Sequence, residues 1–385
     1  MRAIVNGKIY TMAGQIIDGG TVLIEDGKIK AVGADVQVPA GAEVIDAGGK
    51  VVMPGIIDAH THIGLYEEGL GFEGADGNEM TNPATPHLRG LDAINPLEDA
   101  FKNAVAGGVT SVATGPGSAN VIGGQFVAIK THGNIVDDMV MLEPSGLKIA
   151  FGENPKRVYS SQKKSPSTRM ATAAVLRENL VAASNYLAKV EKAGDDPDKA
   201  PERDLKMEIL VKVLKKEIPL RAHAHRADDI ITAIRIAEEF DVEIAIEHCT
   251  EGHLIADFLA EKGVAAVVGP TLGTRPKVEL FNMTFKTPGI LHQAGVKVAL
   301  TSDHPVFPVQ YLPIAAALAH KEGLPEGEAM KAITINAAEV VGTADRVGSL
   351  EVGKDADIVV LSGHLFDWRT VVEKTLIDGE IVYER

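Results

Sequence analysis

The sequence predicts an α/β protein, a (β/α)8 TIM barrel with a small β-sandwich domain built from both chain termini. Three observations predict it. In the centre of the chain, eight apolar, strand-like runs are separated largely by helical patterns, which is typical of a parallel barrel. Both ends of the chain instead hold short β-prone runs and hairpin turns. The chain has 385 residues, which is long for one simple domain.

The two chain ends are predicted to share one domain. Turn dipeptides such as Asn6-Gly7, Asp26-Gly27 and Asp378-Gly379 divide both ends into short runs. Because a few short strands are marginal by themselves, we expect the two ends to pair with each other. The composite β-sandwich domain then covers residues 1–50 plus 350–385, and the barrel covers residues 51–349. The short runs are Ala3–Val5, Lys8–Thr11, Thr21–Glu25, Ala31–Val32, Ala356–Leu361, Val371–Ile377 and Glu380–Tyr383.

The central part of the chain supplies the barrel elements. The predicted strands are Gly55–His62, Gly108–Thr114, Phe126–Lys130, Leu147–Phe151, Pro219–His223, Glu243–His248, Ala265–Val268 and Val296–Thr301. The predicted helices are Thr168–Ala193, Glu202–Lys216, Asp228–Phe240 and Gly252–Lys262, with a polar turn at Gly194–Pro201. No regular helix is predicted within residues 115–146. Residues 69–78 and 160–167 are expected to form loops over a site.

Composition narrows the classes of partner and compartment. The chain is 45% hydrophobic and 24% charged, which is an ordinary globular balance. Its net charge of −15 argues against nucleic acid or an anionic membrane as a partner and favours solubility. The charge does not identify a substrate, and we expect a small molecule. Cys249 is the single cysteine, which suits a reducing compartment, and no apolar run resembles a signal peptide or a membrane span. We expect a cytoplasmic protein and leave a homo-oligomer open.

A pair of histidines closes the first barrel strand. His60 and His62 end the apolar run VVMPGIIDAHTH. Because alternate residues of a strand point to the same side, both imidazoles are expected to converge at the strand end. Two neutral imidazoles at one strand end can supply two of the ligands of a divalent metal site. A bare His-x-His pair also arises by chance, so further ligands must support this interpretation.

Three further residues sit at or just past apolar runs. His223 ends PLRAH, His248 ends EIAIEH, and Asp303 follows VALTS. In a (β/α)8 barrel, functional side chains gather at the carboxyl ends of the strands. Each residue alone has an ordinary explanation, such as a core histidine or a capping aspartate. Together with His60 and His62 they predict a metal cage.

Lys148 interrupts the strand-like run LKIAF. A lysine in a buried strand is costly unless its charge is removed or paired. Addition of CO2 to the neutral amine would give a carbamate, a carboxylate that can bridge two metal ions. Otherwise the strand begins after Lys148 and leaves it exposed at the foot of the barrel. Glu153, at the end of the same strand, is a rival ligand that needs no modification, and we slightly favour Lys148.

The chain resembles the amidohydrolase superfamily, in particular the branch with imidazolonepropionase-related hydrolases and metallo-dipeptidases. The residues that carry the resemblance are VMPGIIDAHTH from Val52, GVTSV from Gly108, AHAH from Ala222, IEHC from Ile246, SDHP from Ser302, ITINAA from Ile333 and GSLEVGKDADIVV from Gly348. The resemblance covers nearly the whole chain and implies the same barrel and β-sandwich. It also implies that His60, His62, His248, Asp303 and a histidine of AHAH bind metal, with His223 favoured and His225 nearer the substrate.

The expected activity is hydrolysis of a C–N bond in a small amide, cyclic amide or dipeptide. One or two divalent ions, most simply zinc, would activate a water molecule. Asp303 would take the proton from this water and pass it to the leaving nitrogen. His225 would polarise the scissile carbonyl, unless it only packs behind the ligands. Three arginines could hold a substrate carboxylate, unless they are solvated surface charges: Arg157, Arg169 and Arg226.

Two alternative functions remain at this stage. A deaminase of an amino-heterocycle uses a similar cage, but related deaminases carry a glutamate shortly after the strand-five histidine, and none is evident after His223. The other alternative is a catalytically inactive scaffold of the same fold. The retention of every cage residue argues against it, because an inactive site need not keep them.

Overall fold

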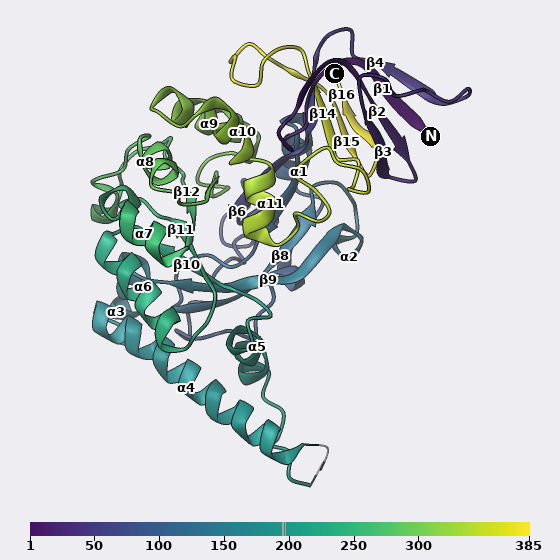
Figure 1. Cartoon of the computed structure of the whole chain (residues 1–385). Helices are drawn as coiled ribbons and strands as arrows, with labels where there is room; N and C mark the ends of the chain where they lie inside the picture. Colours follow the sequence, from purple (N-terminus) through teal and green to yellow (C-terminus); the bar gives the residue numbers. More distant parts are fainter. Residues whose placement is uncertain (195, 197) are drawn as a thin grey trace.

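The computed structural model describes residues 1–194, 196 and 198–385 and arranges its strands in two sheets (Figure 1). One sheet joins strands from both chain ends in the order β16-β15-β14-β5-β1-β2-β3, with β4 beside β1. The other sheet holds β6 to β13 in chain order. The predicted turn at residues 194–201 includes Asp195 and Pro197, which lie outside the described residues.

The strands of the terminal sheet are β1 (Arg2–Tyr10), β2 (Ile16–Glu25), β3 (Lys28–Gly33), β4 (Glu43–Asp46), β5 (Val51–Pro54), β14 (Ile358–Leu361), β15 (Val372–Ile377) and β16 (Glu380–Glu384). The strands of the barrel sheet are β6 (Ile56–Thr61), β7 (Val109–Thr114), β8 (Ile122–Lys130), β9 (Val140–Ala150), β10 (Leu220–Ala224), β11 (Ile244–His248), β12 (Ala265–Val268) and β13 (Val298–Leu300).

The helices are α1 (Asp99–Ala106), α2 (Val136–Met139), α3 (Glu153–Ser161), α4 (Arg169–Ala193), α5 (Leu205–Leu214), α6 (Ala227–Glu239), α7 (Ala256–Lys262), α8 (Thr287–Gln293), α9 (Leu312–Lys321), α10 (Glu326–Lys331) and α11 (Ile335–Val341). Short 3-10 helices lie at Gly90–Ala93, Gly252–Leu254, Val278–Leu280 and Val309–Tyr311.

The two chain ends meet as the sequence predicts. β14 pairs antiparallel with β5, so that Ile358 lies opposite Pro54 and Leu361 opposite Val51. Apolar side chains from both ends form one buried cluster of their own. The strands of this region belong to one continuous hydrogen-bonded sheet. The exact domain boundaries stay a prediction.

The barrel sheet differs from the prediction in the direction of one strand. All its neighbouring strands pair in parallel except β8, which runs antiparallel to both β7 and β9. The expectation of eight parallel strands is therefore wrong at β8. Only residues 115–121 separate β7 from β8, and a parallel crossover needs a dozen residues or more. The sheet is nearly closed, because β6 and β13 end the hydrogen-bonded order and lie close together.

Regular alternation of strand and helix begins at β9. The predicted helices appear as α4, α5, α6 and α7, whereas only the four-residue α2 lies between β8 and β9. The side chain of Thr168 caps α4 by accepting from the Ala171 N–H at 3.1 Å, and Asp204 caps α5 in the same way. The 25-residue α4 projects with α5 away from the body of the molecule (Figure 1).

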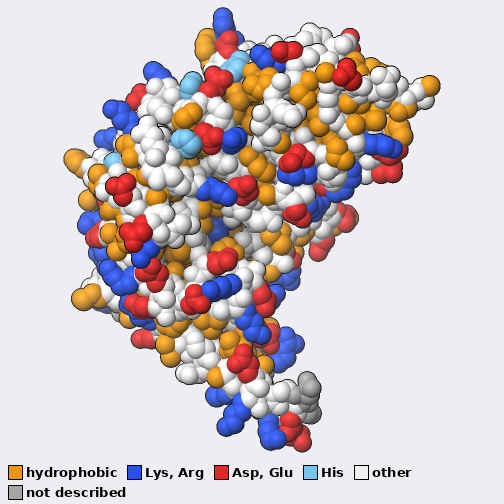
Figure 2. Space-filling view, in the orientation of Figure 1, with side chains coloured by type: hydrophobic (Ala, Val, Ile, Leu, Met, Phe, Trp, Pro, Cys, Tyr) orange, Lys and Arg blue, Asp and Glu red, His pale blue; other side chains and the backbone are white. Residues whose placement is uncertain are grey.

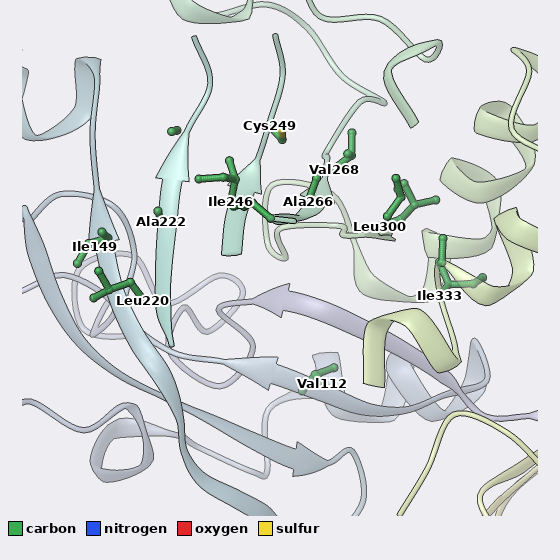
Figure 3. Close-up of a cluster of buried hydrophobic side chains, with 14 of the residues drawn as sticks. Val112, Ile149, Leu220, Ala222, Ile246, Cys249, Ala266, Val268, Leu300 and Ile333 are labelled. Carbon is green, nitrogen blue, oxygen red and sulfur yellow. The ribbon is translucent and has the colours of Figure 1, made fainter. Parts of the chain in front are cut away.

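The alternation along the barrel strands decides which side chains enter the barrel. Ile149, Leu220 and Ile246 belong to a buried apolar cluster that includes residues of the surrounding helices (Figure 3). Their neighbours along the strands point to the opposite side. Three buried charged residues occupy such alternate positions: Lys148, Arg221 and Glu247. These strands therefore place charged groups inside the barrel.

Lys130 ties the barrel to the terminal sheet. It ends β8, and its ammonium lies 2.7 Å from Asp357 Oδ2 and 3.0 Å from Asp355 Oδ2. Asp378, in the turn between β15 and β16, lies 3.3 Å from the same ammonium. Lys130, Asp355 and Asp357 are buried, so these ion pairs are shielded from solvent and contribute to the junction.

The outer surface carries charges of both signs. Figure 2 shows Lys and Arg interspersed with Asp and Glu over the visible face, without a large patch of one sign. Within the described part of the chain, no helix combines the length and the apolar character that crossing a membrane requires.

Glu98 provides a pH-dependent test of the fold. It is 6% exposed, accepts the Gly64 N–H through Oε1, and its Oε2 has no hydrogen-bond partner among the described residues. Burial, followed by repulsion from nearby carboxylates, raises the pKa of Glu98 to about 7. The folded state then binds more protons than the unfolded state between pH 4.5 and 7, so this residue lowers stability as pH rises through that range.

Glu98→Gln is therefore expected to stabilise the protein by about 1–2 kcal/mol at pH 8 and by little at pH 5. Urea denaturation at the two pH values measures the difference. Glu73→Gln, at an exposed position of a neighbouring loop, is the control and should show no such pH dependence. A Glu98→Gln effect that is equal at both pH values would contradict the assignment.

Candidate functional site

The predicted ligands meet at one end of the barrel. His60 ends β6 and His62 follows it, His223 and His225 lie on and just after β10, and His248 ends β11. Asp303 follows β13. The structure groups these residues as two triads, in each of which the ligand atoms lie within 4.8 Å of one another. The triads are His60, His62 and Asp303, and His223, His225 and His248.

The two triads are adjacent. Asp303 Oδ1 lies 3.3 Å from His62 Nε2 and 3.5 Å from His60 Nε2. The rings of His60 and His248, one from each triad, are 5.1 Å apart between centroids. His248 in turn lies 4.4 Å from His223 and 4.8 Å from His225 by the same measure. All six side chains therefore surround one small volume.

Lys148 lies beside this volume. Its side chain is fully buried, and its Nζ is 3.2 Å from His60 Nε2. The alternative in which the strand begins after Lys148 and leaves it exposed is wrong, since β9 runs from Val140 to Ala150. Burial lowers the pKa of Lys148 to about 8, so that roughly a tenth of the amine is neutral at pH 7, far more than for an ordinary lysine.

Four of the five cage histidines are held through the Nδ1 atom. His62 Nδ1 lies 2.7 Å from Gly115 O, and His248 Nδ1 lies 2.8 Å from Gly269 O. A carbonyl oxygen can only accept, so Nδ1 carries the proton and Nε2 keeps a free lone pair. His223 and His225 make 2.8 Å contacts through Nδ1 with the hydroxyls of Ser118 and Thr250. This arrangement is the one by which proteins orient metal-binding imidazoles.

Three ring nitrogens in the cage make no hydrogen bond within the described residues: His60 Nδ1, which faces Glu247 Oε2 at 3.2 Å, and two Nε2 atoms. His225 Nε2 and His248 Nε2 are buried and make no hydrogen bond to any described residue. A buried polar atom left in this way costs about 1–3 kcal/mol. A divalent cation at His248 Nε2 would remove that cost there, and a substrate group at His225 Nε2 would remove it on the cavity side. The donor set of imidazoles, a carboxylate and a lysine amine also suits zinc or a similar ion, so these residues fit a metal centre.

Four histidines of the cage have a lowered pKa, which favours their neutral form at physiological pH: His62, His223, His225 and His248. Burial lowers the pKa of His248 to about 3 against the opposing effect of the Asp303 charge, and it lowers the pKa of His223 and His225 well below the ordinary value. Burial also lowers the pKa of His62. Neutral imidazole is the form that binds metal.

Asp303 is held ionised in spite of its burial. Burial alone would raise its pKa, but the adjacent His248 and contacts from His60 and His62 outweigh this, and the pKa of Asp303 lies well below its usual value. Its backbone has a φ of 53°, and that of His248 has a φ of 69°. Such values are uncommon outside glycine and cluster at functional sites.

Sequence reasoning missed a buried ion pair behind the cage. Glu247 and Arg221 are fully buried and hydrogen-bonded to each other, and Glu247 Oε2 lies 3.2 Å from His60 Nδ1. Arg221 Nη2 also donates to Ala59 O at 2.6 Å. Both residues interrupt apolar runs as Lys148 does, so the same reasoning could have found them. The pair positions His60, the central residue of the first triad.

A cavity of about 480 Å³ opens onto the cage. His62, His223, His225 and Asp303 line its metal end. Further lining comes from Tyr66, Asn78, Ser118, Asn154 and the loop between β12 and α8. A larger cavity of about 760 Å³ lies around the amino ends of β10 to β13, where none of the cage residues is found.

The predicted substrate arginines do not line this cavity. Arg157 is exposed on α3, Arg169 binds Asp229 at 2.9 Å, and Arg226 binds Asp228 at 2.9 Å. The rival ligand Glu153 belongs to neither triad: it begins α3, and its backbone N–H donates to Glu279 Oε2 at 2.9 Å. Lys277 is the residue with a side-chain cation in the cavity lining, and no sequence pattern pointed to it.

Comparisons with known proteins agree with this geometry. A family model described as "Amidohydrolase family" matches residues 51–382. The chain is 31% identical to "Amidohydrolase tasK" from Hapsidospora irregularis over 95% of its own length, and it spans 40% of that protein. It is 27% identical to an imidazolonepropionase from Symbiobacterium thermophilum, over 92% of this chain and 89% of that one. The crystal structure of an amidohydrolase from Thermotoga maritima MSB8 superposes with a TM-score of 0.97 at 48% identity, covering 100% of both chains.

Proposed function

Because the chain belongs to the amidohydrolase family, we propose that it hydrolyses a C–N bond in a small amide, cyclic amide or dipeptide at the cage of His60, His62, His223, His248 and Asp303. The family membership confirms the predicted resemblance and the class of reaction, metal-dependent hydrolysis of a C–N bond. The orphaned Nε2 atoms of His225 and His248 are the observation that carries the proposal.

The groups at the site have separate roles in the proposed reaction. A divalent ion, most simply zinc, would lower the pKa of a bound water molecule and so supply the nucleophile. Asp303, ionised and beside both His60 and His62, accepts the proton from the attacking water and returns it to the leaving nitrogen. His225 lines the cavity, where its ring would polarise the carbonyl of the scissile bond.

Lys148 is the proposed bridge between the two triads. Its neutral amine can add CO2 and become a carbamate, a carboxylate-like group that would supply a bridging ligand for two ions. The fully buried position next to His60 supports this role over that of Glu153. A cavity of about 480 Å³ suits a small substrate. We also propose a cytoplasmic location, a small-molecule substrate, and no nucleic-acid or membrane partner; a homo-oligomer stays open.

The test is removal and return of the metal. The purified protein is expected to contain zinc, to lose hydrolysis of a panel of N-acyl amino acids, cyclic amides and dipeptides when a chelator strips the ion, and to regain it with added zinc. Elemental analysis and the assay measure the two quantities in parallel. A folded protein that stays inert on the whole panel with zinc bound would favour the inactive scaffold instead.

A further inference from the structure

The lining of the cavity in front of the cage holds a side-chain charge of each sign. Asp303 is the acidic residue among its lining side chains and lies at the metal end. Lys277, on the loop between β12 and α8, supplies the cation. A substrate with a negative group would be repelled by the first and attracted by the second. An anionic substrate would therefore turn its negative group towards Lys277 and not towards Asp303.

Lys277 has unused hydrogen-bonding capacity. Its side chain is 22% exposed, and among the described residues its ammonium makes no hydrogen bond. The nearest recorded charge is Glu279 Oε1 at 3.7 Å, which is beyond hydrogen-bond distance. Three donors of a partly buried ammonium are thus free to meet a ligand.

Glu279 shows how close this ammonium is to the cage. The same Glu279 Oε1 that lies 3.7 Å from Lys277 Nζ lies 3.6 Å from His225 Nε2. Because both distances share one oxygen, the ammonium is no farther from His225 Nε2 than their sum. A group held by Lys277 would then stand only a few bonds from the bond under attack. This spacing fits a carboxylate on the residue that carries the scissile nitrogen.

We propose that Lys277 is a specificity-determining residue that binds the carboxylate of the substrate, so that the substrate is an amide of an amino acid with a free carboxylate, such as an N-acyl amino acid or a dipeptide. This inference rests on the proposed function and narrows its substrate class. Part of the cavity wall is apolar and would accept an apolar amino-acid side chain: Leu272, Pro276, Leu280, Met283, Pro305 and Val306.

The test compares N-acetyl-L-leucine with N-acetyl-L-leucinamide, which differ only in the charge of the terminal group. Isothermal titration calorimetry on the zinc-loaded protein measures binding of each, and the same pair is assayed for hydrolysis. The unsubstituted protein is expected to bind the acid more tightly than the amide. Lys277→Met should weaken binding of the acid by roughly 10- to 100-fold and leave the amide unchanged.

Two further variants separate charge from structure. Lys277→Arg keeps the cation and should retain most of the preference for the acid. Lys286→Met removes an exposed lysine that ends the same loop and does not line the cavity, and it should behave as the unsubstituted protein. The inference is overturned if the unsubstituted protein shows no preference for the acid, or if Lys277→Met keeps it.

Failure of the proposed function has a different signature. Suppose that the protein binds the acid more tightly, that this preference depends on Lys277, and that neither compound is hydrolysed. This result would support the carboxylate-binding role of Lys277 and count against the proposed hydrolase function. Hydrolysis of N-acetyl-L-leucine and N-acetyl-L-leucinamide at equal rates would support the hydrolase function. It would overturn the proposed role of Lys277 in binding the carboxylate.

Discussion

Asp303→Asn is expected to lower kcat for C–N hydrolysis by roughly 10²–10⁴-fold, because an amide cannot accept the proton of the attacking water. The carboxylate is ionised in the folded protein, and it lies 3.3 Å from His62 Nε2 and 3.5 Å from His60 Nε2. Steady-state kinetics on a substrate from the panel, with the zinc content measured on the same sample, give the result.

The zinc content separates the two roles of Asp303. A variant that keeps its metal but loses turnover has lost the proton acceptor, whereas loss of both shows that Asp303 chiefly holds the ion. Asp257→Asn, at an exposed position on α7, is the control and should leave kcat unchanged. Near-normal kcat in Asp303→Asn would refute the proposed proton transfer.

Arg221→Met should destabilise the protein by about 3–5 kcal/mol, since it leaves the Glu247 carboxylate buried without its partner. Burial alone would raise the pKa of Glu247, but the Arg221 guanidinium and His60 hold it well below its ordinary value. Loss of the guanidinium also removes the hydrogen bond to Ala59 O, next to His60. Denaturant unfolding measures the change, and a weaker zinc affinity should accompany it.

A double-mutant cycle tests whether the loss of stability in Arg221→Met arises from the unpaired charge of Glu247. Arg221→Met combined with Glu247→Gln should recover much of the lost stability, because neither charge then remains in the interior. The exposed pair of Arg177 and Glu239 is the matched control, and Arg177→Met should cost no more than about 1 kcal/mol. Equal costs for Arg221→Met and Arg177→Met would contradict the interpretation.

Much of the barrel could be predicted because its strands are apolar on a buried sheet. Each of the eight predicted runs overlaps a strand from β6 to β13, and helices were expected where α4, α5 and α6 lie. The direction of β8 was missed, since apolar periodicity reports burial and not strand direction. The short connection at residues 115–121 carried that information, because it leaves no room for a crossover helix.

Some residues of the site could be predicted from the sequence and others could not. His60, His62 and Asp303 were found because they directly end or follow apolar runs, and the structure brings them together in one triad. Arg157, Arg169 and Arg226 were considered for their charge alone, and the structure places them outside the cavity lining. A charge in a loop gives no signal of where it points, and Lys277 was overlooked for the same reason.

The order of residues along this chain was enough to establish a barrel, a terminal sheet shared by both ends, and the candidate ligands at strand ends, because burial and strand periodicity leave a local pattern. Only the tertiary structure decided which side chains meet. The approach of Glu247 to His60, the orphaned nitrogens of His225 and His248, and the position of Lys277 in the cavity depend on contacts between segments far apart in the chain. No local pattern encodes such distances, because they are set by how the strands and loops pack.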